Sequence, residues 1–75
     1  NYPDGFGAIV FPDPSGTNGQ TITVWNRSDG ANANIRDNGF RPIDAAENSV
    51  TYIPIWTIMM FKCIGNQWVL VNTQG

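Results

Sequence analysis

The chain has 75 residues and a mass of 8.2 kDa, enough for one small domain whose core barely offsets the conformational entropy lost on folding. A net charge of −2, a pI near 4.5 and a charged fraction of 13% argue against a nucleic-acid partner, because phosphates need clustered cations. One cysteine and no histidine exclude an internal disulfide and a zinc cluster, and no apolar run approaches the roughly 20 residues of a membrane span.

Branched and turn-forming residues dominate the composition. Ile and Val together number thirteen against a single Leu, and there are nine Asn and eight Gly. Branched residues favour strands, whereas Asn and Gly favour turns. The sequence therefore predicts an all-β fold, a small antiparallel sandwich or barrel-like module, with no cofactor and no metal.

The N-terminal half predicts short strands separated by turns. Because the first residue is Asn1 and not Met, we expect a fragment or a processed product. Residues 1–19 predict an entry segment with one short strand at 8–11, ahead of a β module at 19–72. Further short strands are expected at 20–25, 33–36 and 40–43, with an Asn38-Gly39 hairpin turn before the last of them.

The C-terminal half is more apolar. A polar connection at 44–48, where a single helical turn fits, precedes a strand at 49–53 that Pro54 interrupts. A long strand at 57–64 and its partner at 67–72 are joined by Gly65-Asn66, which predicts a type II′ turn.

This hairpin can be registered from the sequence. A two-residue turn pairs Ile64 with Gln67, and outward from there Cys63 with Trp68, Lys62 with Val69, Phe61 with Leu70, Met60 with Val71 and Met59 with Asn72. The side with Cys63, Phe61 and Trp68 predicts the core. The other side is too apolar to face water in a monomer, and it predicts a subunit interface formed by Met60, Ile64, Val69 and Val71.

The order of these pieces resembles a known family. The segment Gly19-x-Thr21-Ile22-Thr23-Val24-x-Asn26 is followed by short strands, the Asp37-Asn38-Gly39 turn and finally Gly65-Asn66-Gln67-Trp68-Val69-Leu70-Val71. This pattern, over about residues 19–71, is similar to small β modules of bacteriophage tail fibres and tailspikes. The resemblance implies a homotrimer, which agrees with the interface inferred from the hairpin, and a place in the virion, extracellular when acting.

Catalysis finds little support among the residues. General acid–base chemistry needs a group tuned near neutral pH, and the chain has no histidine, one lysine and one glutamate, with its aspartates in turns. Cys63 lies in mid-strand on the predicted core face, so a buried small hydrophobe is the expected role. We therefore expect no enzymatic activity, although a trimer could bring together the two carboxylates that a carbohydrate-active enzyme needs.

Binding is the better candidate. Strand alternation places Trp25 opposite Ile22 and Val24, and the next residues include Asn26, Arg27 and Asp29. An exposed indole can stack on the apolar face of a sugar while amides, guanidinium and carboxylate bond its hydroxyls. The alternative is that Trp25 packs in a subunit interface and that its neighbours only form a turn.

Three further residues extend this candidate site. Trp56 follows a bend and predicts either an aromatic platform or packing under a loop. Arg36 and Arg41 flank the Asn38-Gly39 turn and could bind an acidic sugar or a lipopolysaccharide phosphate, or instead pair with nearby aspartates. Trp68, by contrast, is expected to be structural.

The expected function is therefore host-surface attachment, through glycans such as a cell-surface polysaccharide or through trimerisation of a larger fibre. The alternative from another class is a purely structural virion protein, a capsid decoration or assembly domain without a ligand. A fragment of a carbohydrate-active enzyme is the third.

Overall fold

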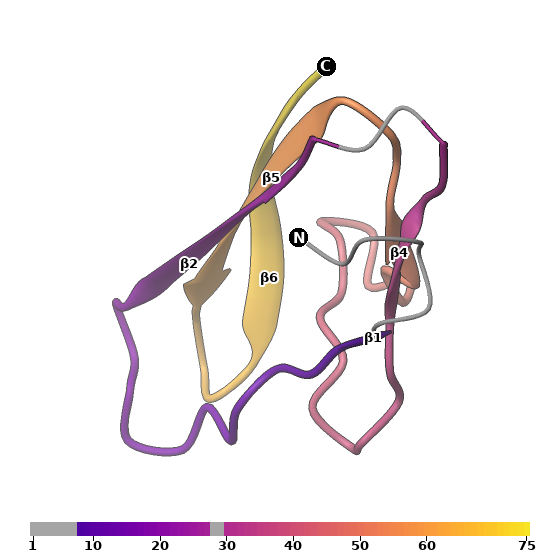
Figure 1. The fold of residues 1–75 in the computed structure, drawn as a ribbon. Coiled ribbons are helices and arrows are strands. Elements are labelled where there is room, and N and C mark those ends of the chain that lie inside the picture. Colours follow the sequence, from indigo (N-terminus) through magenta and orange to yellow (C-terminus); the bar gives the residue numbers. More distant parts are fainter. Residues whose placement is uncertain (1–7, 28–29) are drawn as a thin grey trace.

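The computed structural model describes residues 8–27 and 30–75, which contain two three-stranded sheets and no helix (Figure 1). The predicted all-β class is thus confirmed. The Cα radius of gyration is 11.8 Å, close to the roughly 11 Å expected for a compact domain of this length. The strands are β1 Ala8–Ile9, β2 Thr21–Asn26, β3 Ala33–Ile35, β4 Tyr52–Ile53, β5 Thr57–Cys63 and β6 Trp68–Gln74.

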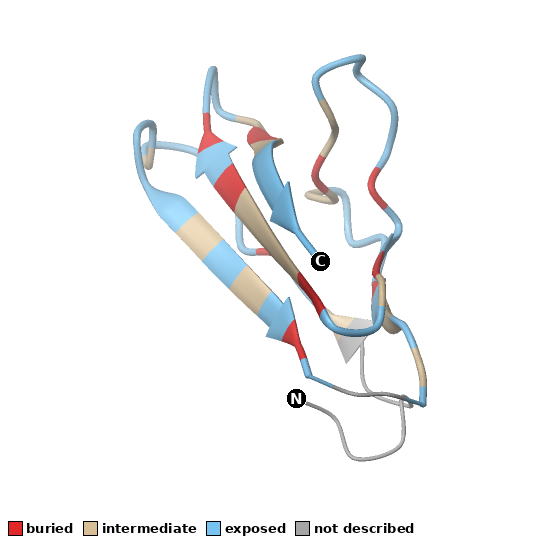
Figure 2. Cartoon of the chain, turned by 90° about the horizontal axis from the view of Figure 1, so that it is seen from above, coloured by how far each residue is buried: buried red, intermediate tan, exposed pale blue. Residues whose placement is uncertain are grey.

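The larger sheet has the order β2-β5-β6 and is antiparallel throughout. Its β2 strand forms where alternation predicted it, and Figure 2 shows the alternation as intermediate and exposed bands along the strand. Ile22 and Val24 pack against the core, whereas Thr21, Thr23 and Trp25 are exposed. The sheet therefore has an inner face toward the core and an opposite face toward solvent.

The β5–β6 hairpin turns where the sequence predicted, but with a different turn type. Gly65 and Asn66 both have positive φ, 60° and 58°, which is the signature of type I′, not of the predicted type II′. Ile64 and Gln67 exchange backbone hydrogen bonds of 2.8 and 3.2 Å across the turn. Asn tolerates the left-handed region well, so Gly-Asn can supply both residues of the turn that best matches strand twist.

The predicted hairpin register holds as far as Phe61 opposite Leu70 and then shifts by one residue. Met60 lies opposite Asn72, not Val71, because a bulge between Met60 and Phe61 leaves Val71 as the extra residue. A bulge adds one residue to one strand and increases its local twist. The predicted pairs Met60–Val71 and Met59–Asn72 were therefore wrong.

The smaller sheet has the order β1-β3-β4, with β1 and β3 parallel and β3 and β4 antiparallel. The strand expected at 40–43 does not form: Ile43 makes only isolated bridges, to Ser49 and Val69. The helical turn considered at 44–48 is a non-helical turn in which the Asp44 carboxylate accepts the backbone N–H groups of Ala46 and Asn48.

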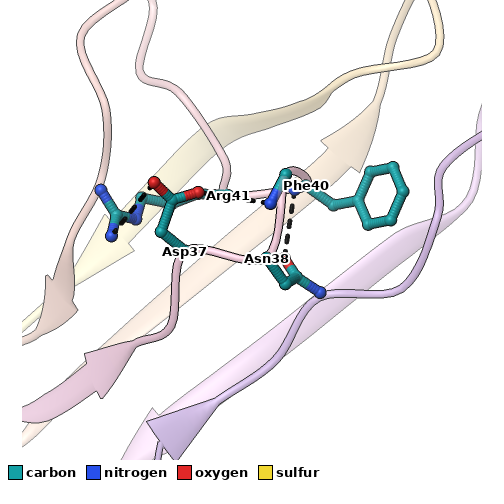
Figure 3. A network of polar contacts seen from close by, with 5 residues as sticks. Asp37, Asn38, Phe40 and Arg41 are labelled. Atoms are coloured by element: carbon teal, nitrogen blue, oxygen red, sulfur yellow. Dashed lines mark hydrogen bonds and ion pairs between the residues drawn. The ribbon is translucent and has the colours of Figure 1, made fainter.

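The expected Asn38-Gly39 hairpin is also wrong, because the residues after the turn form no strand. Within the turn, the side chains of Asp37 and Asn38 contact neighbouring residues (Figure 3). The Asn38 oxygen accepts the N–H of Phe40 at 3.1 Å, and its amide donates to the carbonyl of Phe11 at 2.9 Å. The bond to Phe11 anchors the turn to a distant segment. Consequently β3 pairs with β1 and β4, and not with the residues that follow the turn.

Residues 8–19 pack against the rest of the fold and contribute Phe11 to its core. Phe11 is 1% exposed, and its ring meets that of Phe61 edge-on at 4.9 Å. The Trp68 indole donates to the carbonyl of Pro12 at 2.8 Å, and the backbones of Gly19 and Cys63 are bonded at 2.8 Å. The short strand expected at 8–11 forms over Ala8–Ile9, and the segment after it is bonded to β5 and β6.

The core draws on both sheets and on the segments between them. Its buried apolar members are Phe11, Ile35, Val50, Ile53, Phe61, Cys63 and Trp68. Trp68 is 2% exposed, whereas Trp25 and Trp56 are both 51% exposed. The predictions that Trp68 is a core residue and that Cys63 is a buried small hydrophobe are confirmed.

Candidate functional site

Trp25 and Arg27 lie together at the C-terminal end of β2. The Arg27 guanidinium sits 4.8 Å from the centroid of the Trp25 ring, a cation–π contact between two exposed side chains. Such contacts at exposed sites are worth about 0.5–1 kcal/mol. The pair thus has a defined geometry, with the indole held in place on the solvent side of the sheet.

The two other members of the predicted Trp25 turn do not join them. Asn26 is 2% exposed, and its amide donates to the carbonyls of Ala31 and Ile53, at 3.1 and 3.0 Å. It thereby ties β2 to β4 from the inside, since strand alternation turns it away from Trp25. The Asn26 amide therefore serves the fold and does not face the solvent beside Trp25. Asp29 lies outside the described residues.

Trp56 occupies the turn between β4 and β5, with a φ of 52°. Left-handed backbone is unusual for a large aromatic residue. Because Asn26 pairs with Thr57 at the end of the β2–β5 ladder, Trp56 lies next to that end of the ladder, as Trp25 does.

Arg36 and Arg41 are not cross-strand neighbours, because no strand follows the Asn38 turn. Arg41 forms an ion pair with Asp37 at 4.0 Å (Figure 3), the alternative role expected for these arginines. Exposed pairs of this kind contribute little to stability. Arg36 follows β3, and its backbone N–H donates to the carbonyl of Ile9 at 2.8 Å.

The solvent side of β2-β5-β6 carries the exposed Trp25 together with the half-buried Ile58, Met60 and Val69, and we call it the outer face. Register pairs Trp25 with Ile58, Thr23 with Met60 and Thr21 with Lys62 across β2 and β5. On the other side of β5, Val69 lies opposite Lys62, Asn72 opposite Met60 and Gln74 opposite Ile58. The outer face is therefore made by Thr21, Thr23, Trp25, Ile58, Met60, Lys62, Val69, Asn72 and Gln74.

The predicted interface residues lie on or beside this face. Met60 and Val69 belong to it and are half-buried, while Ile64 at the end of β5 and Val71 at the bulge are 51% and 47% exposed. Sequence reasoning missed Ile58 and the continuity with Trp25. The alternation of β5 contained the signal for Ile58, but the pairing of β2 with β5 was not predicted.

A groove of about 240 Å³ was also missed. It is bounded by side chains of the 44–54 segment and of the inner face: Asp44, Ser49, Val50, Thr51, Tyr52, Pro54, Met59 and Leu70. Tyr52 is 44% exposed there. The groove combines segments that the sequence does not place together, so a single-sequence pattern could not reveal it.

A carboxyl group in the loop before β2 has a shifted pKa. The pKa of Asp13 is lowered, because its carboxylate accepts the backbone N–H of Ser15 at 2.9 Å and also bonds the Ser15 side chain. That arrangement stabilises a loop turn. Among the described residues, no three His, Cys, Asp or Glu side chains gather as metal ligands.

Comparison with protein-family models, with curated proteins and with solved structures finds no match for this chain. No helix in residues 8–27 or 30–75 is long and apolar enough to cross a membrane.

Proposed function

We propose that this chain is a self-associating β module of a bacteriophage tail fibre or tailspike, in which three copies pack through the outer face. In this proposal each copy is a small open sandwich, its two sheets sharing one core. The module holds three copies of a longer fibre chain together on the outside of the virion. It also helps to attach the fibre to the host surface.

The composition of the outer face is the observation that supports association. Interface centres are enriched in aromatic residues and Met and depleted of charge. Here Trp25 lies opposite Ile58, Met60 follows two residues along β5, and Val69 lies opposite Lys62. The charge on this side comes from Lys62 and, over the Trp25 ring, from Arg27. Monomers seldom leave so contiguous an apolar patch in water. A core this small stabilises an isolated chain only weakly. Association with other copies raises the free energy of unfolding.

Val69→Asp is expected to dissociate the assembly. Light scattering of the wild-type chain at micromolar concentration should give three times the 8.2 kDa chain mass, whereas the variant should give the monomer mass. The reason is that an unpaired carboxylate buried between subunits costs several kcal/mol. A wild-type chain that is folded and monomeric at these concentrations contradicts the proposal.

Val10→Asp is the matched control. Val10 is 53% exposed and lies next to β1, away from the outer face. The same chemical change there should leave the trimer intact. If both variants dissociate equally, the effect is general destabilisation and the outer face is not specifically involved.

Glycan attachment is a second candidate function, favoured by the groove beside Tyr52. Its volume of about 240 Å³ is below the 300–1,000 Å³ typical of drug-sized ligands and suits a single sugar ring. Tyr52, Pro54 and Met59 offer apolar surface to the ring, and Asp44, Ser49 and Thr51 offer polar groups to its hydroxyls. A trimer would carry three such grooves. Once one groove is bound, the others meet the same polysaccharide at a high effective concentration, which raises the overall affinity.

Tyr52→Ala is expected to weaken sugar binding without changing the oligomeric mass. Chemical shifts of the groove amides would be followed during titration with glucose, N-acetylglucosamine and glucuronate. Neutral sugars should shift Thr51 and Tyr52, and glucuronate should shift them less, because Asp44 is the charged residue of the lining. A weak site has a dissociation constant of about 1 mM, so 100 mM sugar should nearly saturate it. If no sugar shifts these amides at that concentration, attachment at this groove is contradicted.

A further inference from the structure

The β2 strand has one unpaired edge. It is bonded only to β5, at a margin of its sheet (Figure 1). The Cys63 N–H donates to the carbonyl of Gln20 at 2.8 Å, and antiparallel alternation then turns the backbone groups of Ile22 and Val24 toward β5. Those of Thr21, Thr23 and Trp25 point the other way. In the described part of the chain no backbone group bonds them there.

The opposite margin of the same sheet is unpaired along the second half of β6. Its first half is covered by Ile43, which donates to the carbonyl of Trp68 at 3.0 Å and accepts the N–H of Leu70 at 2.8 Å. From residue 71 to 74, no other described segment bonds this side of β6. The sheet therefore has two unpaired edges, one on each side of the outer face.

The β2 edge carries no feature that would prevent pairing with another strand. Natural edge strands are commonly short, or protected by Pro, a bulge or a charged side chain. β1 and β4 follow this rule with two residues each. β2 is six residues long, with the sequence TITVWN, which contains no Pro and no charge. It is suited to accept a strand.

A second copy of the chain offers an edge that matches β2 in direction. β2 and β6 run in the same direction, because each is antiparallel to β5. Rotation about an axis along the strands keeps that direction, so β6 of one copy can lie parallel to β2 of the next. A contact between two different edges is heterologous, and it closes into a ring when the rotation allows. One repeated contact then pairs each β2 edge with the unpaired half of a neighbouring β6.

We propose that three copies close their β2-β5-β6 sheets into one nine-stranded barrel, with the outer face inside. This inference rests on the trimer proposed above and specifies how it is built. Barrels of eight strands leave an interior that side chains just fill. Nine strands come close to that size, whereas two copies give six strands and four copies give twelve.

The outer face fits such an interior. Trp25 with Ile58 lies toward one end, Met60 in the middle, and Val69 with Lys62 toward the Gly65 turn. The apolar side chains of three copies fill the barrel, and Lys62 lies near its mouth. The long apolar stem of a lysine lets its ammonium reach water from such a position.

Hydrogen exchange tests the barrel separately from the trimer. In the wild-type chain the amide of Thr23, and that of Thr21 or Trp25, should exchange about 100-fold more slowly than in monomeric Val69→Asp, because residues 71–74 of a neighbouring β6 become bonded to them. Equal rates in a confirmed trimer would show face-to-face packing without edge pairing, and would overturn the barrel but not the trimer. A monomeric or dimeric wild-type mass overturns both.

Thr23→Pro and Thr23→Ala form a matched pair of variants. The Thr23 N–H points away from β5, so proline removes the edge donor without removing a β2–β5 bond. Light scattering should show at least a tenfold weaker trimer for proline and an unchanged trimer for alanine. A proline variant that stays trimeric overturns the barrel. If that variant fails to fold by circular dichroism, the wild-type exchange rates decide.

Discussion

Replacing Trp68 with alanine is expected to unfold the isolated domain. Trp68 is 2% exposed, pairs with Cys63 across the hairpin and lies 6.1 Å from the Phe11 ring. Truncating a buried Trp costs about 3–5 kcal/mol, and a domain of this size has only about 4–11 kcal/mol in total. Loss of the sigmoidal urea transition, or a midpoint shifted far toward zero, is the expected measurement.

Two other substitutions separate packing from hydrogen bonding at this site. Trp68→Phe keeps a buried ring but removes the hydrogen bond to the carbonyl of Pro12. It should lower the free energy of unfolding by about 1 kcal/mol more than the loss of buried apolar area accounts for. Trp56→Ala is the control, because that side chain is 51% exposed and surface changes are usually within about 0.5 kcal/mol. A Trp68→Ala chain as stable as Trp56→Ala would contradict the placement of the core.

Phe11→Ala should be nearly as damaging, although Phe11 precedes the part of the chain that the sequence marks as the β module. Its ring is 1% exposed and meets Phe61 edge-on at 4.9 Å. The free energy of unfolding should fall by about 3–5 kcal/mol because of the cavity. Loss of the aromatic pair should lower it by about 0.5–1.5 kcal/mol more. Denaturation midpoints would measure it.

Val10→Ala is the neighbouring control. Val10 is adjacent in sequence but 53% exposed, so its truncation should leave the denaturation midpoint almost unchanged. If Phe11→Ala behaves like Val10→Ala, residues 8–19 are indeed an entry segment that the fold can spare. The expected difference between the two variants therefore tests directly where the domain begins.

Local patterns in the sequence were enough for the strands of the larger sheet. The alternation of Thr21–Asn26 and the Gly65-Asn66 turn each depend on neighbouring residues, so β2 and the β5–β6 hairpin could be placed within one or two residues. The core position of Trp68 follows from the same register. The register fails only beyond Leu70, because the bulge at Val71 is an extra residue that no local signal marks.

The candidate site was predicted only in part, for a similar reason. Exposure of Trp25 follows from alternation within β2, but its place beside Ile58 depends on the pairing of β2 with β5. Asn26 shows the same limit, since its amide bonds a carbonyl 27 residues away. The sequence suggested a ligand-binding turn there, whereas the structure makes Trp25 continuous with the hairpin face.

By itself the sequence determined the all-β class, the absence of an internal disulfide and the apolar second side of the hairpin, because composition, cysteine count and alternation are properties of adjacent residues. Only the tertiary structure decided that Phe11 belongs to the core, that Asn38 anchors its turn to the Phe11 carbonyl, and that β2 and β6 leave two edges unpaired. These features depend on groups brought together over long loops. The indole of Trp68 and the carbonyl of Pro12, 56 residues apart, are bonded in this way. The free energy of such contacts depends on how the whole chain packs, and no local pattern encodes it.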